Sequence, residues 1–185
     1  EDTLSLHDAL PIYSLYMDLL NKAVQALKSG EILDFDQLDS ESCEVDFKVS
    51  AILPDNYVPD VNLRLILYKR IATAANFEQL ADLKLELADR FGPLPEQVKN
   101  LLMTTEVKIK ANQLGITKID VGLTSGKLKF NKKPKVNFNT VINLIQTQPQ
   151  QYKLAGPDVL NFHFPMENIE QKYATVNNVL DKLAS

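Results

Sequence analysis

Apolar residues in the stretch 76–115 recur with a helical period and predict two helices joined as a hairpin. In the first arm, 76–92, the apolar positions on one side are Leu80, Leu83, Leu87 and Phe91. Asn76 followed three residues later by a glutamine is typical of a helix start, and Gly92 suits a helix end. A short link of glycine and proline residues then predicts a tight connection to the second arm.

The second arm, 95–114, is apolar on two sides. One side carries Val98, Leu101, Leu102, Thr105 and Ile109. The other side carries Met103, Val107 and Leu114. A helix with two apolar sides is buried between neighbours, so we expect this arm to pack in the centre of the domain.

The helix expected to begin near Asp60 also shows two apolar sides. One side consists of Val61, Leu65, Tyr68 and Ala72. The other consists of Leu63, Leu67 and Ile71. We therefore expect both sides to be buried, with Lys69 and Arg70 in the remaining polar strip.

After Gly115 the hydrophobic period changes to two, which predicts strands. Turns are placed at Ser125–Gly126 and at Gly156–Pro157. The expected elements are strands over 119–123 and 128–130, a helix over 139–148, strands over 152–154 and 160–164, and a helix over 167–183. With a half-buried strand over 43–49, this order predicts the α+β class, in which the helical hairpin and further helices pack on a small antiparallel sheet built from hairpins.

The amino-terminal region divides into three segments before the domain at 43–185. Residues 1–12 include a ten-residue stretch that matches a translated sequencing adapter, so we interpret them as an artefact and exclude them from fold reasoning. On this interpretation the natural protein continues upstream. Residues 13–30 predict a helix ended by Gly30, and residues 31–42 are acidic without a base, which is typical of a linker.

Composition narrows the class of protein. Hydrophobic residues make up 45% and charged residues 24%, as in ordinary globular domains, and no apolar run is long enough to span a membrane. Cys43 is the only cysteine, so no internal disulfide forms and a cytosolic location is expected. The net charge of −4 gives no indication of overall nucleic-acid binding, although a local basic patch remains compatible with it.

Candidate catalytic residues are few. The glycines form no phosphate-binding loop, and one histidine outside the adapter segment, His163, with one cysteine cannot assemble a usual zinc site. We interpret His163 as a surface strand residue and Cys43 as a partly buried small residue, because nearby acids do not activate a thiol. The sequence predicts no catalytic residue and no metal or cofactor, although a divalent cation on Asp82, Glu86 and Asp89 is a minor alternative.

The polar face of the first hairpin arm has two interpretations. Asp82, Glu86 and Asp89 lie opposite the leucine stripe, Arg90 lies beside Glu86, and Leu85 also points to this side. An apolar residue among charges on an outward face is a small indication of partner binding. From composition alone, a solvated helix surface is the commoner explanation.

A cluster of lysines marks one predicted hairpin strand and the segment after it. The cluster consists of Lys127, Lys129, Lys132, Lys133 and Lys135. Lysines along a strand edge prevent pairing with other chains. The functional alternative is an accessory nucleic-acid-binding module that contacts phosphates, without aromatic residues for stacking on bases.

Several separated motifs resemble one bacterial family. They are Leu53-Pro-Asp-Asn-Tyr-Val-Pro-Asp60, Leu63-Arg-Leu-Ile-Leu-Tyr-Lys-Arg-Ile-Ala72, Glu86-Leu-Ala-Asp-Arg-Phe-Gly-Pro-Leu-Pro95, Leu114-Gly-Ile-Thr-Lys118 and Gln148-Pro-Gln-Gln-Tyr152. In this order they resemble the C-terminal domain of the bacterial transcription-repair coupling factors (Mfd). The resemblance runs from Tyr13 to the end, so residues 13–30 are expected to be the last helix of a translocase module.

The resemblance implies a function for the whole family member and a role for this domain. The whole protein is an ATP- and magnesium-dependent translocase on duplex DNA that removes stalled RNA polymerase and recruits the repair subunit UvrA. Its ATPase motifs lie upstream, so this domain is expected to be non-catalytic, monomeric and cytoplasmic. It docks on the N-terminal UvrA-binding region and masks it, through residues that correspond here to Glu86, Asp89 and Arg90. We add Asp82 and Leu85 as further candidates on the same face.

Overall fold

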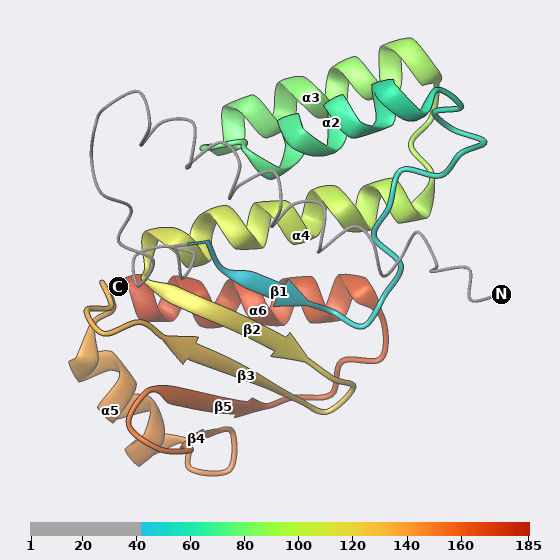
Figure 1. Ribbon diagram of the computed structural model, residues 1–185. Helices are drawn as coiled ribbons and strands as arrows, with labels where there is room; N and C mark the ends of the chain where they lie inside the picture. Colours follow the sequence, from blue (N-terminus) through green and yellow to red (C-terminus); the bar gives the residue numbers. More distant parts are fainter. Residues whose placement is uncertain (1–41) are drawn as a thin grey trace, which may run out of the picture. The chain divides into compact units, whose positions relative to one another are not determined.

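A computed structural model describes residues 42–185, which form five helices and five strands. In chain order these are β1 (Glu44–Asp46), α2 (Val61–Ala72), α3 (Phe77–Phe91), α4 (Glu96–Gln113), β2 (Ile116–Val121), β3 (Ser125–Phe130), α5 (Phe138–Thr147), β4 (Tyr152–Leu154), β5 (Val159–His163) and α6 (Ile169–Ala184) (Figure 1). The predicted α+β class is confirmed. The predictions for 1–12, for 13–30 and for all of 31–42 except Ser42 lie outside the described residues.

The sheet has the strand order β1-β2-β3-β5-β4 and is mixed. The pairs β2–β3 and β4–β5 are antiparallel hairpins, as predicted, and β3 pairs with β5 in the same way. The expectation of a wholly antiparallel sheet is wrong at one edge, because β1 pairs with β2 in parallel. Three helices separate these two strands in the chain, and such a long crossover can return a strand in the same direction, whereas a tight turn cannot.

The first hairpin turns earlier than predicted. The backbone N–H of Gly122 donates to the carbonyl of Ser125 at 2.8 Å, so the turn lies before residues 125 and 126. Ser125 and Gly126 belong to β3, where they pair with His163 and Phe162. Gly126 therefore serves packing rather than turning, because the Phe162 ring occupies the space that a side chain would need.

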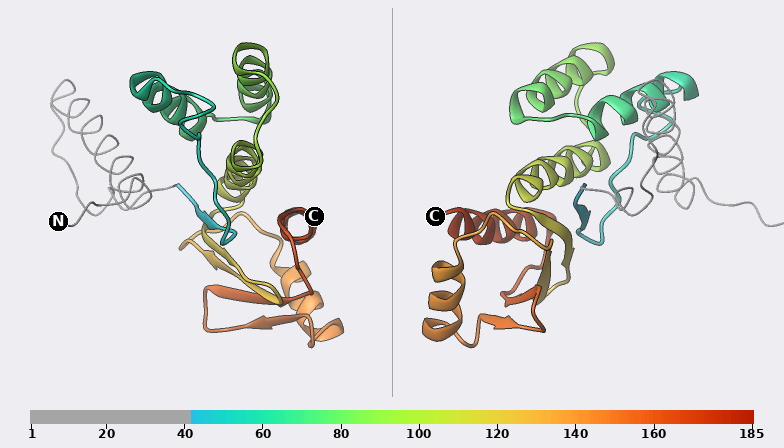
Figure 2. Two further views of the ribbon diagram at one scale, coloured as in Figure 1. Left: turned by 90° about the vertical axis from the view of Figure 1, so that its right-hand side faces the viewer. Right: turned by 60° about the vertical axis from the view of Figure 1, so that its left-hand side comes forward.

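Helix α4 is shared by two hydrophobic cores. The first core lies between α2, α3 and α4, to which α4 contributes Val98, Leu102 and Ile109. The second core lies between the sheet and helices α4, α5 and α6, to which α4 contributes Val107 and Ala111. Figure 2 shows α4 between the α2–α3 pair and the sheet. This arrangement agrees with the central position predicted from the two apolar sides of this arm.

Helix α2 departs from its predicted burial. Leu67 and Ile71 are buried, as expected for one side. On the other side Val61 is 57% exposed and Leu65 is 38% exposed, so the prediction of two buried sides is wrong. Within residues 42–185, α2 packs on α3 and α4 alone among the helices and leaves its outer side uncovered.

We expect Gly126→Ala to lower the free energy of unfolding by about 1–3 kcal/mol. The added Cβ would lie 2.1 Å from Cζ of Phe162, whose side chain is fully buried. Urea unfolding followed by circular dichroism measures the effect. Gly122→Ala is the control, because its Cβ would meet only the Ser125 carbonyl at 3.4 Å. Equal stability of the two variants would contradict the tight packing.

Candidate docking site

The α3–α4 hairpin holds the candidate face in a fixed orientation. The Asn76 side chain accepts a hydrogen bond from the backbone N–H of Gln79, and the Gln79 side chain accepts one from the N–H of Ala75, each at 2.9 Å. At the other end, Gly92 has a φ of 86°, a conformation that favours glycine. Helix α3 buries Leu80, Leu83 and Leu87 and packs Phe91 against the same core, so the opposite side of the helix faces outward.

The five predicted docking residues are accessible on α3. Leu85 is 69% exposed, and Asp82, Asp89 and Arg90 are also exposed. The Glu86 side chain retains 28% of its surface. Each residue therefore offers surface to a partner.

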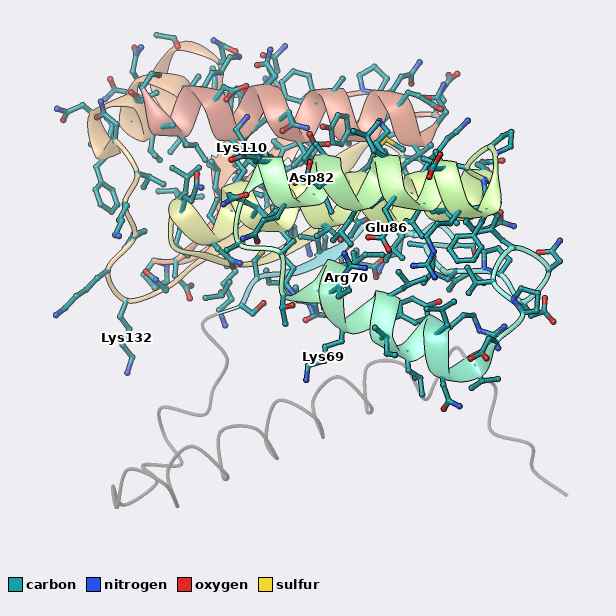
Figure 3. All side chains as sticks on the ribbon, turned by 90° about the horizontal axis from the view of Figure 1, so that it is seen from above. Lys69, Arg70, Asp82, Glu86, Lys110 and Lys132 are labelled. Atoms are coloured by element: carbon teal, nitrogen blue, oxygen red, sulfur yellow. The ribbon has the colours of Figure 1, made fainter. Side chains whose placement is uncertain are left out.

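Glu86 is held by two arginines. Arg70 of α2 donates two hydrogen bonds to its carboxylate, at 2.9 and 2.6 Å, and Arg90 donates one at 2.7 Å. Figure 3 shows Arg70 and Glu86 pointing toward each other from neighbouring helices. A bidentate arginine–carboxylate pair of this kind fixes both the position and the orientation of the carboxylate. Glu86 therefore belongs to a preformed cluster.

Arg70 is the residue of this site that sequence reasoning missed. The helical pattern assigned it only to a polar strip, because a pattern along one helix does not say which residue of another helix lies opposite. The sequence signal that could have indicated Arg70 is its positive charge, located in the last turn of α2. Only the packing of α2 against α3 pairs it with Glu86.

Tyr57 holds the C-terminal end of α3 in place and packs on the aromatic ring that contacts Arg90. The Tyr57 hydroxyl lies 2.9 Å from the carbonyl oxygen of Leu87 and 3.1 Å from that of Gly92. Its ring packs on Phe91 with 5.6 Å between centroids, and the Arg90 guanidinium lies 5.2 Å from the centroid of Phe91. Arg90 is thus placed between an aromatic ring and the Glu86 carboxylate, which restricts its freedom before any partner arrives.

The electrostatics follow from this cluster. Hydrogen bonds from Arg70 and then Arg90 lower the pKa of Glu86 from its ordinary 4.5 to about 2. The same contact raises the pKa of Arg70. Glu86 therefore remains ionised throughout the physiological range. Asp82 and Asp89 form no ion pair with any cation of residues 42–185, and they supply negative charge that a partner can neutralise.

A depression borders the face where α2 ends and α3 begins. It encloses about 260 Å³ and is lined by Arg70, Thr73, Ala74, Gln79, Asp82 and Leu83. Its walls combine a guanidinium, a carboxylate and an amide, which are groups that recognise polar side chains. The candidate face therefore carries a depression as well as charge.

The alternative chemical sites are not assembled in the described residues. Within residues 42–185, no three side chains of His, Cys, Asp or Glu gather into a possible metal site. His163 is exposed on β5. It belongs to the sheet, which α4 separates from the acidic face of α3. Cys43 is buried rather than partly buried, and burial raises the pKa of its thiol to about 12, so it stays protonated at neutral pH.

The five lysines of the predicted basic cluster fall into two groups. Lys127 and Lys129 are outward-facing residues of β3. Lys132, Lys133 and Lys135 lie on the connector between β3 and α5, all exposed, and Figure 3 shows Lys132 pointing away from the body of the domain. The cluster is thus contiguous in sequence but divided in structure.

Comparison with known proteins identifies the class of the fold. The crystal structure of the C-terminal domain of transcription-repair coupling factor matches with a TM-score of 0.65 at 20% identity, covering 77% of this chain and 91% of that one. The domain therefore has the fold of such a C-terminal domain.

The family is shown by sequence. The profile of the TRCF domain matches residues 47–141, more than half of the chain, and the protein belongs to this family. It is 40% identical over 171 residues to the transcription-repair-coupling factor of Haemophilus influenzae, and 43% identical over 150 residues to that of Escherichia coli. These matches cover 92% and 81% of this chain but only 15% and 13% of the relatives. In the described part, no helix has the length and apolar character needed to cross a bilayer.

We expect Glu86→Gln to lower the free energy of unfolding at neutral pH by about 1 kcal/mol, because exposed ion pairs contribute about 0.2–1 kcal/mol each. The pKa of Glu86 is depressed from 4.5 to about 2, so its stabilisation is complete above the higher value and is lost as pH falls toward the lower one. Urea unfolding of both proteins across this range measures the difference.

The control for this experiment is Asp89→Asn. Asp89 contributes no ion pair within residues 42–185, so its replacement should leave the pH profile of stability almost unchanged. A wild-type advantage over Glu86→Gln that stays constant down to the acid end would contradict the arginine–carboxylate cluster.

Proposed function

We propose that this domain is a non-catalytic regulatory module of a transcription-repair coupling factor, and that its α3 face docks on the N-terminal UvrA-binding region of the same protein. The observation that carries the proposal is the outward cluster of Arg70, Glu86 and Arg90 beside two carboxylates, Asp82 and Asp89, that form no ion pair within residues 42–185. The family membership supports it, since Glu86, Asp89 and Arg90, the docking residues expected from the resemblance, all offer surface on α3.

The parent protein in this proposal is an ATP-dependent translocase on duplex DNA. It displaces stalled RNA polymerase and recruits nucleotide-excision repair through UvrA, and ATP and magnesium act in its upstream part. The similarity to transcription-repair-coupling factors of other bacteria supports the setting in repair. Residues 42–185 contribute the docking surface and carry out no reaction.

The strength of such docking suits a reversible contact. Exposed ion pairs contribute about 0.2–1 kcal/mol each, so a few charges with Leu85 would bind weakly between separate molecules. Within one chain, the connection raises the effective concentration to about the millimolar range, which favours the docked state without new contacts. Rearrangement of neighbouring domains on polymerase engagement is then sufficient to release it.

The preformed cluster makes the docking face specific. Glu86 and Arg90 are already ordered by Arg70 and Phe91, so little side-chain entropy is lost when a partner binds. Asp89 and Asp82 remain available for basic groups of the partner. A complementary partner surface therefore carries basic side chains opposite the acids and an apolar contact for Leu85.

We expect the double reversal Glu86→Lys and Asp89→Lys, made in the full-length protein, to increase UvrA affinity by roughly tenfold to a hundredfold. If the UvrA-binding site is accessible only about 1% of the time, its apparent affinity for UvrA is about a hundredfold lower than its intrinsic affinity. Undocking of the α3 face would restore the intrinsic affinity. Binding of purified UvrA followed by calorimetry or interferometry measures the change.

The matched control reverses Glu96 and Glu170, two exposed acids on α4 and α6. The charge change is identical, but neither residue lies on the α3 face, so UvrA affinity should remain at the wild-type value. Wild-type affinity in the Glu86/Asp89 variant, with circular dichroism showing an intact fold, would overturn the proposed docking.

A further inference from the structure

The sheet has one face without a helix in residues 42–185. Helices α4, α5 and α6 pack against the inward residues of the strands, and in the view of Figure 1 the sheet lies in front of α6. The alternating burial of β2, β3 and β5 identifies the outward positions. They include the polar residues Lys118, Asp120, Ser125, Lys127, Lys129, Asn161 and His163 and the half-buried Val159.

Strand register arranges the charges of this open face in a row. Asp46, Asp120 and Lys127 are paired across β1, β2 and β3. The row continues from Lys127 to Asn161 on β5 and from Asn161 to Lys153 on β4. Acidic residues thus occupy the β1 side of the sheet, and lysines occupy the β3–β5–β4 side.

The two sides of the row differ in ion pairing. On the acidic side, Lys118 contacts Glu44 at 2.9 Å, and Lys48 contacts Asp120 at 3.3 Å. Within residues 42–185, no carboxylate lies within ion-pair distance of Lys127, Lys129 or Lys153. Their positive charge is therefore available to an external anion.

Asn161 lies between two of these lysines in the strand register, but its carbonyl oxygen is no part of the anion-binding surface. Its side-chain carbonyl is buried and has no hydrogen-bond partner in the described part of the chain. Strand spacing places the backbones of Lys127 and Lys153 about 10 Å apart, and Lys129 about 7 Å along β3 from Lys127. Three exposed cations thus form a patch, which we call the sheet-face patch: Lys127, Lys129 and Lys153.

We propose that the sheet-face patch binds the phosphate backbone of duplex DNA. Lysines are mobile point charges that adapt to repeated phosphates, whereas a fixed carboxylate is better matched by arginine. None of the large exposed apolar side chains in residues 42–185 is an outward residue of β3 or β5, so the patch lacks the apolar centre of a protein interface. It also lacks exposed aromatic rings for stacking on single-stranded bases.

This contact is separate from the docking proposed for α3. Helix α4 lies between the α2–α3 pair and the sheet, so the two surfaces are accessible at the same time. The lysines of the connector, Lys132, Lys133 and Lys135, are not required by the patch. Failure of one proposal therefore leaves the other intact.

The test measures binding of the complete chain to a fluorescent duplex of arbitrary sequence at low salt. We expect Lys127→Glu with Lys153→Glu to weaken binding at least tenfold. The slope of log affinity against log salt should also fall by about 2, since each phosphate contact contributes about 0.9. The matched control reverses Lys84 and Lys99, exposed residues of α3 and α4, and should bind like the wild type.

Three results would overturn the proposal. The first is no salt-dependent binding by the wild-type chain. The second is equal weakening by the patch and control variants, which would indicate a response to net charge alone. The third is displacement of the duplex by polyglutamate as effectively as by unlabelled DNA at equal charge, which would identify the patch as a surface for acidic polypeptides. Circular dichroism confirms that each variant is folded.

Discussion

Burial of α4 on two sides is the constraint on which the domain depends. Each fully buried Val or Leu side chain contributes about 1.5–3 kcal/mol relative to an exposed one, and α4 places such residues in both cores. Both cores need this helix, because α4 packs against α2 and α3 on one side and against the sheet on the other. The orientation of the α3 face follows from where α4 lies, and α4 together with α5 and α6 covers one face of the sheet.

The candidate docking face illustrates how a polar cluster is built on an apolar scaffold. Leucines on one side of α3 fix which residues point outward, and α2 then brings Arg70 within reach of Glu86. Tyr57 and Phe91 complete the arrangement at the end of the helix. The charges themselves contribute little stability in water, so their value lies in direction and spacing rather than in strength.

Sequence periodicity predicted what a single element determines and missed what depends on pairs of elements. The start of α3 at Asn76, its outward residues and the shared role of α4 follow from one helix read alone. The contact of Arg70 with Glu86, the parallel pairing of β1 and the exposed side of α2 depend on tertiary placement, which no local pattern contains. The lysines show the same limit: a run that is contiguous in sequence divides into strand and connector, while Lys153 joins the strand group through register alone.

The edge strand β1 determines how a load on the preceding chain enters this domain. It is held by the Cys43 N–H on the Asn112 side chain, by the buried Lys172 ammonium on the Phe47 carbonyl and by its ladder with β2. Tension arriving at residue 42 is therefore borne first by the sheet, and α3 lies outside that path. Under the proposed function, in which a translocase precedes this domain, such an anchorage would let the domain be pulled without distorting the proposed docking surface on α3.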